Sequence, residues 1–130
     1  MKLFVREPWS DEAVTVWEAA DRRISSRLLY PEARAALAAA VRAGRLEPDR
    51  LGKARSELER LWAAIDCVEL APALARRAGD LAGRHGLRGY DAVHLASLEA
   101  VVAEDTVLVA ADAPLLAAAE SAGIDVVRLL

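Results

Sequence analysis

The feature that most constrains the fold of this chain is the alternation of short apolar segments with longer helical ones. The clearest short segment is Thr106-Val107-Leu108-Val109, which is rich in β-branched residues and is flanked by acids. Residues 22–26, 67–70 and 125–129 are further strand candidates. Strands that alternate with helices form a largely parallel sheet with helices on its faces, so the sequence predicts an α/β fold.

The helices are predicted from apolar residues at helical spacing and from the proline and glycine residues near their ends. They cover residues 11–20, 31–44, 48–65, 72–86, 91–103 and 114–123. The helices at 31–44 and 48–65 follow each other closely, so we expect an antiparallel hairpin. One Phe, two Tyr and three Trp are few bulky side chains, which predicts a core of Leu, Val and Ala.

Length and composition narrow the class of protein. A chain of 130 residues has the size of one domain. A single cysteine, Cys67, excludes an internal disulfide and a cysteine zinc cluster, which fits a reducing cytoplasm. No apolar run is long enough to span a membrane. The net charge of −3 gives no global basic field for nucleic acid. Of the 17 basic residues, all except Lys2 and Lys53 are Arg, which binds phosphate well, so a local basic rim stays an alternative.

Residues 86–96 contain the strongest candidate for a functional position. Gly86 and Gly89 precede Asp91, an acid at the start of a strongly apolar helix. Glu32 and Asp112 also lie at helix starts that follow predicted strands. Ligands of open parallel sheets bind at the carboxyl ends of strands, so the three acids are expected to face one edge. Three carboxylates at one place require a cation, and oxygen ligands suit Mg²⁺ or Mn²⁺.

Each of these residues also has an ordinary structural explanation. Asp112 precedes Pro114 and can be a helix N-cap, whereas Glu32 and Asp91 can be first-turn acids that interact with the helix dipole. His94 lies among apolar residues, so a core histidine is favoured over a catalytic one. The three acids together favour a site, because each begins a helix on the same side of the predicted sheet.

Several stretches of the chain resemble one known family. The matching stretches are residues 2–8, 30–34, 85–96 and 109–112, the last followed by Leu115-Leu116. In this order they are similar to PIN-domain proteins of the VapC toxin type. The resemblance implies a three-layer PIN-like fold with a mostly parallel sheet flanked by helices, as a single domain over residues 1–130.

The resemblance also implies a function. It points to a metal-dependent endoribonuclease that hydrolyses RNA phosphodiesters as the toxin of a type II toxin–antitoxin pair. Glu32, Asp91 and Asp112 take the family's second, third and fourth acidic positions, and would hold Mg²⁺ or Mn²⁺. The implied partners are RNA, a VapB-type antitoxin and a second copy of the chain, in the cytoplasm and without a membrane.

The chain departs from the family pattern at its start. The family opens with a strand ending in Asp, then Ser or Thr, then a helix whose middle resembles residues 1–5 of this chain. We therefore expect the first strand and its Asp to be absent, the chain to be N-terminally truncated relative to the family, and the natural protein to begin upstream. The expected consequence is a gap at the centre of the sheet, a rearranged or swapped N-terminus, or reduced stability. Ala110 also stands where the family often has Thr.

Two alternatives remain open. The first is a catalytically impaired PIN-like binding protein that retains antitoxin binding or self-association. The second is a structural α/β module without a site. Clustering of Glu32, Asp91 and Asp112 would argue against the structural module.

Overall fold

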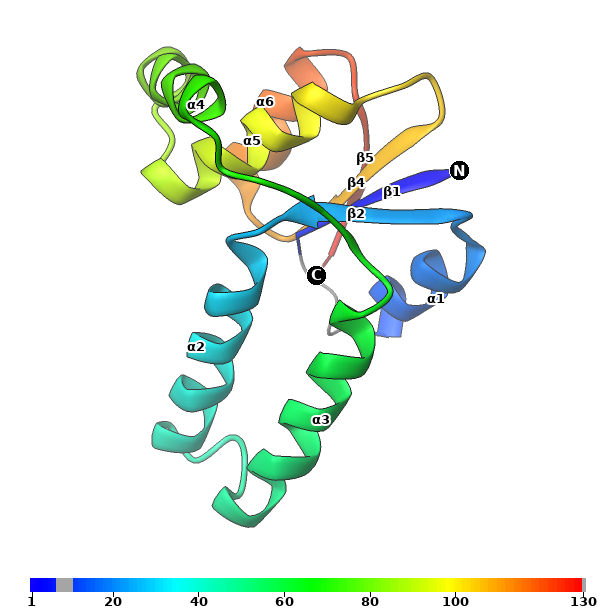
Figure 1. Ribbon diagram of the computed structural model, residues 1–130, viewed down its shortest axis with the longest axis vertical. Coiled ribbons are helices and arrows are strands. Elements are labelled where there is room, and N and C mark those ends of the chain that lie inside the picture. The colour runs from blue at the N-terminus through cyan, green and yellow to red at the C-terminus, as the bar shows by residue number, and fades with distance from the viewer. Residues whose placement is uncertain (7–10, 130) are drawn as a thin grey trace. The chain divides into compact units, whose positions relative to one another are not determined.

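A five-stranded parallel sheet is the framework of the computed structural model, which describes residues 1–6 and 11–129 (Figure 1). The strand order is β3-β2-β1-β4-β5, and every neighbouring pair is parallel. The strands are β1 (Lys2–Val5), β2 (Arg22–Ser26), β3 (Asp66–Val68), β4 (Thr106–Ala110) and β5 (Asp125–Arg128). The predicted α/β class with a parallel sheet is confirmed.

The chain divides into two compact units. The first comprises Met1–Arg27 and Asp66–Leu130, and the second comprises Leu28–Ile65. Helices of the first unit are α1 (Asp11–Ala19), α4 (Pro72–His85), α5 (Gly89–Val101) and α6 (Ala113–Ser121). The second unit holds α2 (Leu29–Arg42), the short 3₁₀ helix η1 (Pro48–Arg50) and α3 (Leu51–Trp62). Across the described residues, none of these helices is long and apolar enough to cross a membrane.

Strand β1 corrects the expectation for the start of the chain. Lys2–Val5 is the central strand, paired with β2 on one side and β4 on the other. The expected gap at the sheet centre is therefore wrong, as is the helical interpretation of residues 1–5. Leu3, Phe4 and Val5 are all fully buried, which fits a strand covered on both faces, where a continuous apolar run replaces the alternating pattern.

The core of the first unit lies between the sheet and the helices α4, α5 and α6. Phe4, Ile24 and Leu108 contribute from three neighbouring strands, and Leu95 and Leu115 contribute from α5 and α6. Leu and Ala dominate this cluster, as predicted, whereas valine, the third predicted residue type, packs against it from partly buried positions. Phe4 is among the largest fully buried side chains, so the only Phe of the chain fills the centre of the unit.

The connections of β1 create a switch point in the sheet. The chain leaves β1 toward β2 through α1, which lies on the opposite face from α5 and α6 (Figure 1). It enters β4, the other neighbour of β1, from α5. Crevices for ligands form where the strand order reverses, outside the carboxyl ends of such strands. The topology thus identifies the edge after β1 and β4 as the first place to look for a site.

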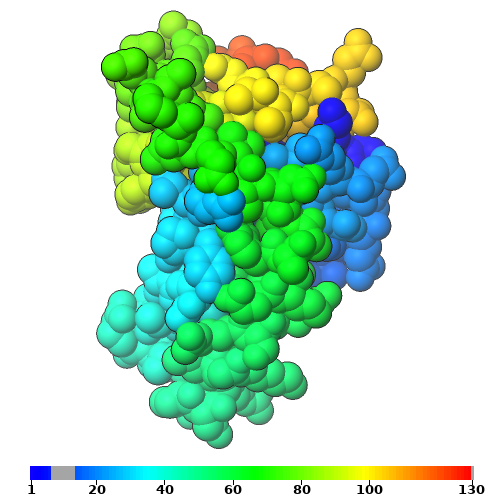
Figure 2. Space-filling view, in the orientation of Figure 1, coloured from blue at the N-terminus to red at the C-terminus, as the bar shows by residue number. Residues whose placement is uncertain are grey.

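The second unit is the predicted antiparallel helical hairpin. Tyr30 near the start of α2 packs on Trp62 at the end of α3, with ring centroids 5.4 Å apart. The Tyr30 hydroxyl also donates a hydrogen bond to Glu59 of α3. Gly44 adopts φ 74° just beyond α2, a left-handed conformation that ends the helix where the sequence predicted a glycine cap. The side chains of α2 and α3 meet along the hairpin (Figure 2).

Candidate functional site

The candidate site lies at the carboxyl ends of β1 and β4. Val5 and Val109 are register partners, and the amide of Arg6 donates to the carbonyl of Val109 at 3.1 Å, which extends the pairing by one residue. Arg6 follows β1 directly, and Asp112 follows β4 after one intervening residue. The two strand ends therefore bring a cation and an acid to the same edge.

Asp91 reaches this edge from the first turn of α5. The preceding helix, α4, ends at Gly86, whose φ of 65° is a left-handed conformation that glycine adopts at low cost. Arg88 is extended at the N-cap position, and α5 then begins at Gly89. The Asp91 side chain is only 2% exposed. A buried carboxylate needs compensating partners, because water no longer solvates its charge.

Asp112 combines a structural and a candidate functional role. It is the N-cap of α6, and its Oδ2 accepts a hydrogen bond from the Leu115 amide at 3.0 Å. The N-cap role that the sequence left open is thus confirmed. The second oxygen, Oδ1, lies 3.5 Å from Nη2 of Arg88. Because a cap uses only one carboxylate oxygen, the cap and a ligand role are compatible.

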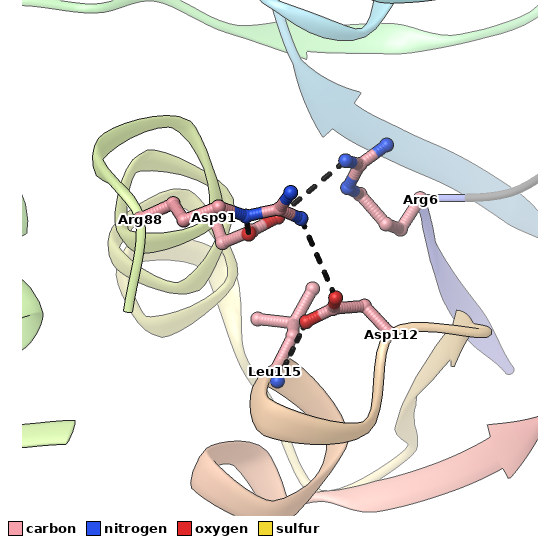
Figure 3. A network of polar contacts seen from close by, with 5 residues as sticks. All are labelled: Arg6, Arg88, Asp91, Asp112 and Leu115. Carbon is pink, nitrogen blue, oxygen red and sulfur yellow. Dashed lines mark hydrogen bonds and ion pairs between the residues drawn. The ribbon is translucent and has the colours of Figure 1, made fainter. Parts of the chain in front are cut away.

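Two arginines compensate the acid pair (Figure 3). Arg88 donates from Nε to Oδ2 of Asp91 at 2.8 Å and reaches Asp112 through Nη2. Arg6 donates from Nη2 to Oδ1 of Asp91 at 3.5 Å. The hydrogen bond to Asp91, with the charges of that acid and Asp112 adding to it, raises the pKa of the Arg88 guanidinium above its ordinary value. One guanidinium therefore bridges both acids, and a second holds the buried one.

The arrangement fits a hard divalent cation. It offers two carboxylates, and a positive group already lies between them. Mg²⁺ is commonly held by one or two protein carboxylates and keeps several waters or phosphate oxygens as its other ligands. Within the described residues of this unit, no third Asp, Glu, His or Cys joins Asp91 and Asp112 in a metal-holding group. The pair thus suits an ion that shares its coordination sphere with substrate.

Glu32, the third predicted ligand, lies in the first turn of α2. It belongs to the second unit, whereas Asp91 and Asp112 belong to the first. The structure therefore brings two of the three predicted acids together, and the convergence of Glu32 with them stays a prediction. The position of Glu32 in its own helix matches the first-turn acid expected from the sequence.

Arg6 and Arg88 are the site residues that the sequence interpretation missed. Arg88 had a local signal, since it stands three residues before Asp91 and side chains at this spacing meet at a helix start. Arg6 had no such signal, because the helical interpretation of residues 1–5 placed no strand end before it. Only a strand that ends at Val5 brings Arg6 to the carboxyl edge of the sheet. His94 is fully buried in α5, in agreement with the core position favoured for it.

Comparison with known proteins gives close sequence relatives. The chain is 45% identical over 123 residues to "Ribonuclease VapC49" of Mycobacterium tuberculosis strain H37Rv, which covers 95% of this chain and 85% of that protein. The same identity and coverage hold for "Ribonuclease VapC45" of Mycobacterium tuberculosis strain CDC 1551. No family model matches the chain.

Two solved structures share the fold. The toxin–antitoxin complex from Klebsiella pneumoniae superimposes with a TM-score of 0.59 and 15% identity, covering 86% of this chain and 87% of that one. VapBC2 from Rickettsia felis, crystallised with a DNA fragment from its promoter, gives a TM-score of 0.63 and 11% identity, covering 98% of both chains. At these identities the likeness concerns the fold alone.

Proposed function

Because the chain belongs to the VapC family of ribonucleases, we propose that it is a metal-dependent endoribonuclease and the toxin of a toxin–antitoxin pair. The observation that carries this proposal is the acid pair Asp91–Asp112 with a cation between its members. The similarity to the VapC ribonuclease is not confined to this pair, since the 45% identity holds over 95% of the chain. The substrate is RNA with an accessible backbone, in single strands or loops.

In this proposal Asp91, Asp112 and Glu32 hold Mg²⁺ or Mn²⁺. A bound ion of this kind supplies an activated water for attack on the phosphodiester and stabilises the charge of the leaving oxygen. The protein's contribution is to fix the ligands. Asp91 is buried at the start of a long helix, and the Leu115 amide holds one oxygen of Asp112. Ligands fixed in this way need little reorganisation when an ion arrives.

The proposal includes partners. An antitoxin of the VapB type would inhibit the ribonuclease in the cytoplasm, and the chain would pair with a second copy of itself. The amphipathic hairpin of α2 and α3 supports both, since two amphipathic helices can present apolar side chains to a partner helix or to a second hairpin. The solved complexes that share the fold are toxin–antitoxin assemblies, which also favours this choice.

The substitution Asp91→Asn tests the catalytic part of the proposal. It keeps the shape of the side chain and removes the charge that holds a cation. Purified protein is expected to cleave single-stranded RNA with Mg²⁺ or Mn²⁺ and to lose this activity with EDTA or with Asp91→Asn. Asp80→Asn, at an exposed position of α4, is the matched control and should cleave like the parent. Cleavage by Asp91→Asn at the parental rate would refute the assignment.

A second candidate function rests on a different observation. The residue after the central strand β1 is Arg6, and its guanidinium contacts the buried acid Asp91. By the PIN resemblance, the strand at the centre of the sheet ends in Asp, so a cation after the strand that holds this place here favours a catalytically impaired protein that only binds its antitoxin or itself. Mn²⁺ titration separates the two functions, because the binding protein has no need to take up the ion.

A further inference from the structure

Arg88 occupies an unusual position for a side chain that is largely in water. Its guanidinium bridges Asp91, which is 2% exposed, and Asp112, which is 23% exposed, while Arg88 itself is 62% exposed (Figure 3). An exposed arginine normally loses conformational freedom for a small gain when it forms ion pairs. Here one side chain pairs with two acids from different helices at the candidate site.

Arg88 and a metal ion compete for the same atoms. Asp91 Oδ2 accepts from Arg88 at 2.8 Å, and Asp112 Oδ1 faces the same guanidinium. Asp112 Oδ2 is engaged by the Leu115 amide, so Oδ1 is the oxygen left for an ion. An ion that binds both acids must therefore displace Arg88. Arg6, the other cation at Asp91, is only 11% exposed, so Arg88 is the residue with room to leave.

A displaced Arg88 stays beside the site. It lies at the N-cap of α5, and its Cζ is 4.9 Å from the ring centroid of Tyr90, which is 45% exposed. This cation–π contact already exists while the guanidinium donors face the two acids, and it can keep the group beside the site when those donors are released. Planar guanidinium groups bind phosphate oxygens in pairs, and RNA that reaches the ion presents a phosphate close by.

We propose that Arg88 has two positions: it is the counter-ion of Asp91 and Asp112 before metal binds, and it binds the RNA phosphate once an ion holds these acids. This inference rests on the proposed ribonuclease function. It assigns Arg88 to substrate binding and makes it, together with Arg6, a counter-ion of the acid pair in the absence of metal. Metal and RNA binding are coupled as a result, because the ion frees the group that holds the substrate.

The substitution Arg88→Gln separates the two roles, because it should affect metal and RNA in opposite directions. By calorimetry without RNA, Mn²⁺ is expected to bind about three- to tenfold more tightly, since a competing cation is gone. Single-stranded RNA, measured by fluorescence anisotropy in Ca²⁺ with intactness checked on gels, is expected to bind more weakly. The slope of log affinity against log salt should fall by about 0.7, the value of one lost phosphate contact.

Two further variants control this experiment. Arg77→Gln removes a partly exposed arginine that pairs with Glu99 of α5, away from the acid pair, and should match the parent in both titrations. Arg88→Lys keeps the charge and should restore the salt slope, whereas its RNA affinity should stay below the parental value because Lys cannot contact two phosphate oxygens in a pair. Circular dichroism verifies that each variant is folded.

The outcomes distinguish this inference from the proposed function. If the parent bound no Mn²⁺, the proposed function would fail and the inference with it. If the parent bound Mn²⁺ and Arg88→Gln bound it no more tightly, or bound RNA with unchanged affinity and salt slope, the inference alone would be overturned.

Discussion

At the scale of single residues, the site reuses side chains that the fold already needs. Asp112 caps α6 through one oxygen and faces Arg88 with the other, and Asp91 is at once a first-turn acid and the buried member of the pair. The structural and functional explanations of an acid at a helix start are therefore not exclusive here. Substitutions that preserve one role and remove the other can separate them.

Asp112 allows such a separation. Asp112→Asn keeps an oxygen that accepts from the Leu115 amide, so the free energy of unfolding in urea should stay close to the parental value. Asp112→Ala removes the cap and should lower that free energy by about 1 kcal/mol. Both variants remove the charge and should weaken Mn²⁺ binding in calorimetry. Equal stability of Asp112→Ala and the parent would contradict the cap, and parental Mn²⁺ affinity in Asp112→Asn would contradict the ligand role.

At the scale of elements, β1 is the decisive strand. It is the only described strand in the middle of the sheet order, and its pairing with β2 and β4 sets the positions of Arg6 and Asp112. Its four residues are too few to fold alone, so the strand is stabilised by burial and by hydrogen bonds to both neighbours. Its largest buried side chain is that of Phe4.

Truncation of Phe4 measures this contribution. Phe4→Ala is expected to lower the free energy of unfolding by about 3–5 kcal/mol, because it removes a fully buried ring and leaves a cavity in the core. Val14→Ala is the control, since Val14 lies on α1 and is 46% exposed; its effect should be below about 0.5 kcal/mol. Denaturant unfolding provides the measurement. A loss for Phe4→Ala as small as that for Val14→Ala would exclude a central buried strand.

The ion pair between Arg77 of α4 and Glu99 of α5 depends on pH. The hydrogen bond from Arg77 lowers the pKa of Glu99 below its ordinary value of 4.5. A carboxyl group with a lowered folded pKa stabilises the protein above its unfolded pKa, and this stabilisation is lost as pH falls through the folded pKa. Glu99→Gln should thus lower the melting temperature at pH 7 by about 1–3 °C, a small effect because both partners are exposed to screening solvent.

The melting curves should be repeated at decreasing pH. The difference between Glu99→Gln and the parent is expected to shrink below about pH 4.5. Glu104→Gln, at an exposed position just before β4, serves as control and should melt with the parent throughout. A difference that stayed constant down to pH 3 would show that the charge of Glu99 does not cause it.

At the scale of the whole molecule, the two units have different characters. The first is a sheet with a continuous core, and the second is a helical hairpin with a modest number of buried side chains. Leu37 and Val41 of α2 are only half-buried within the chain. Apolar residues left partly in water on a hairpin are the kind of surface that a partner covers.

Self-association through the hairpin is therefore expected. Size-exclusion chromatography with light scattering should show a dimer whose fraction grows with concentration. Leu37→Asp should shift the protein toward monomer, because it places a charge in the apolar surface. Ala36→Asp adds the same charge at the neighbouring exposed position and should leave the dimer intact, provided that both variants keep the parental circular dichroism. A parent that stays monomeric at every concentration would rule out self-association.

The sequence determined those features that depend on neighbours along the chain. The strand at 106–109, the hairpin and the helix starts at Asp91 and Asp112 all follow from local periodicity, proline, glycine and capping residues, which act over a few positions. The acids were found because each stands at the start of a helix. Strand β1 was missed because three consecutive apolar residues carry no period of their own, and the resemblance assigned them to a helix.

Only the tertiary structure decided the order of the strands and the partners of the acids. Pairing in a parallel sheet joins residues that are distant in sequence, and β1 gains its central place from hydrogen bonds to β2 and β4 together. The contact of Arg6 with Asp91 spans 85 positions. No local pattern contains such a contact, because it forms only when burial of Leu3, Phe4 and Val5 draws the start of the chain into the middle of the sheet.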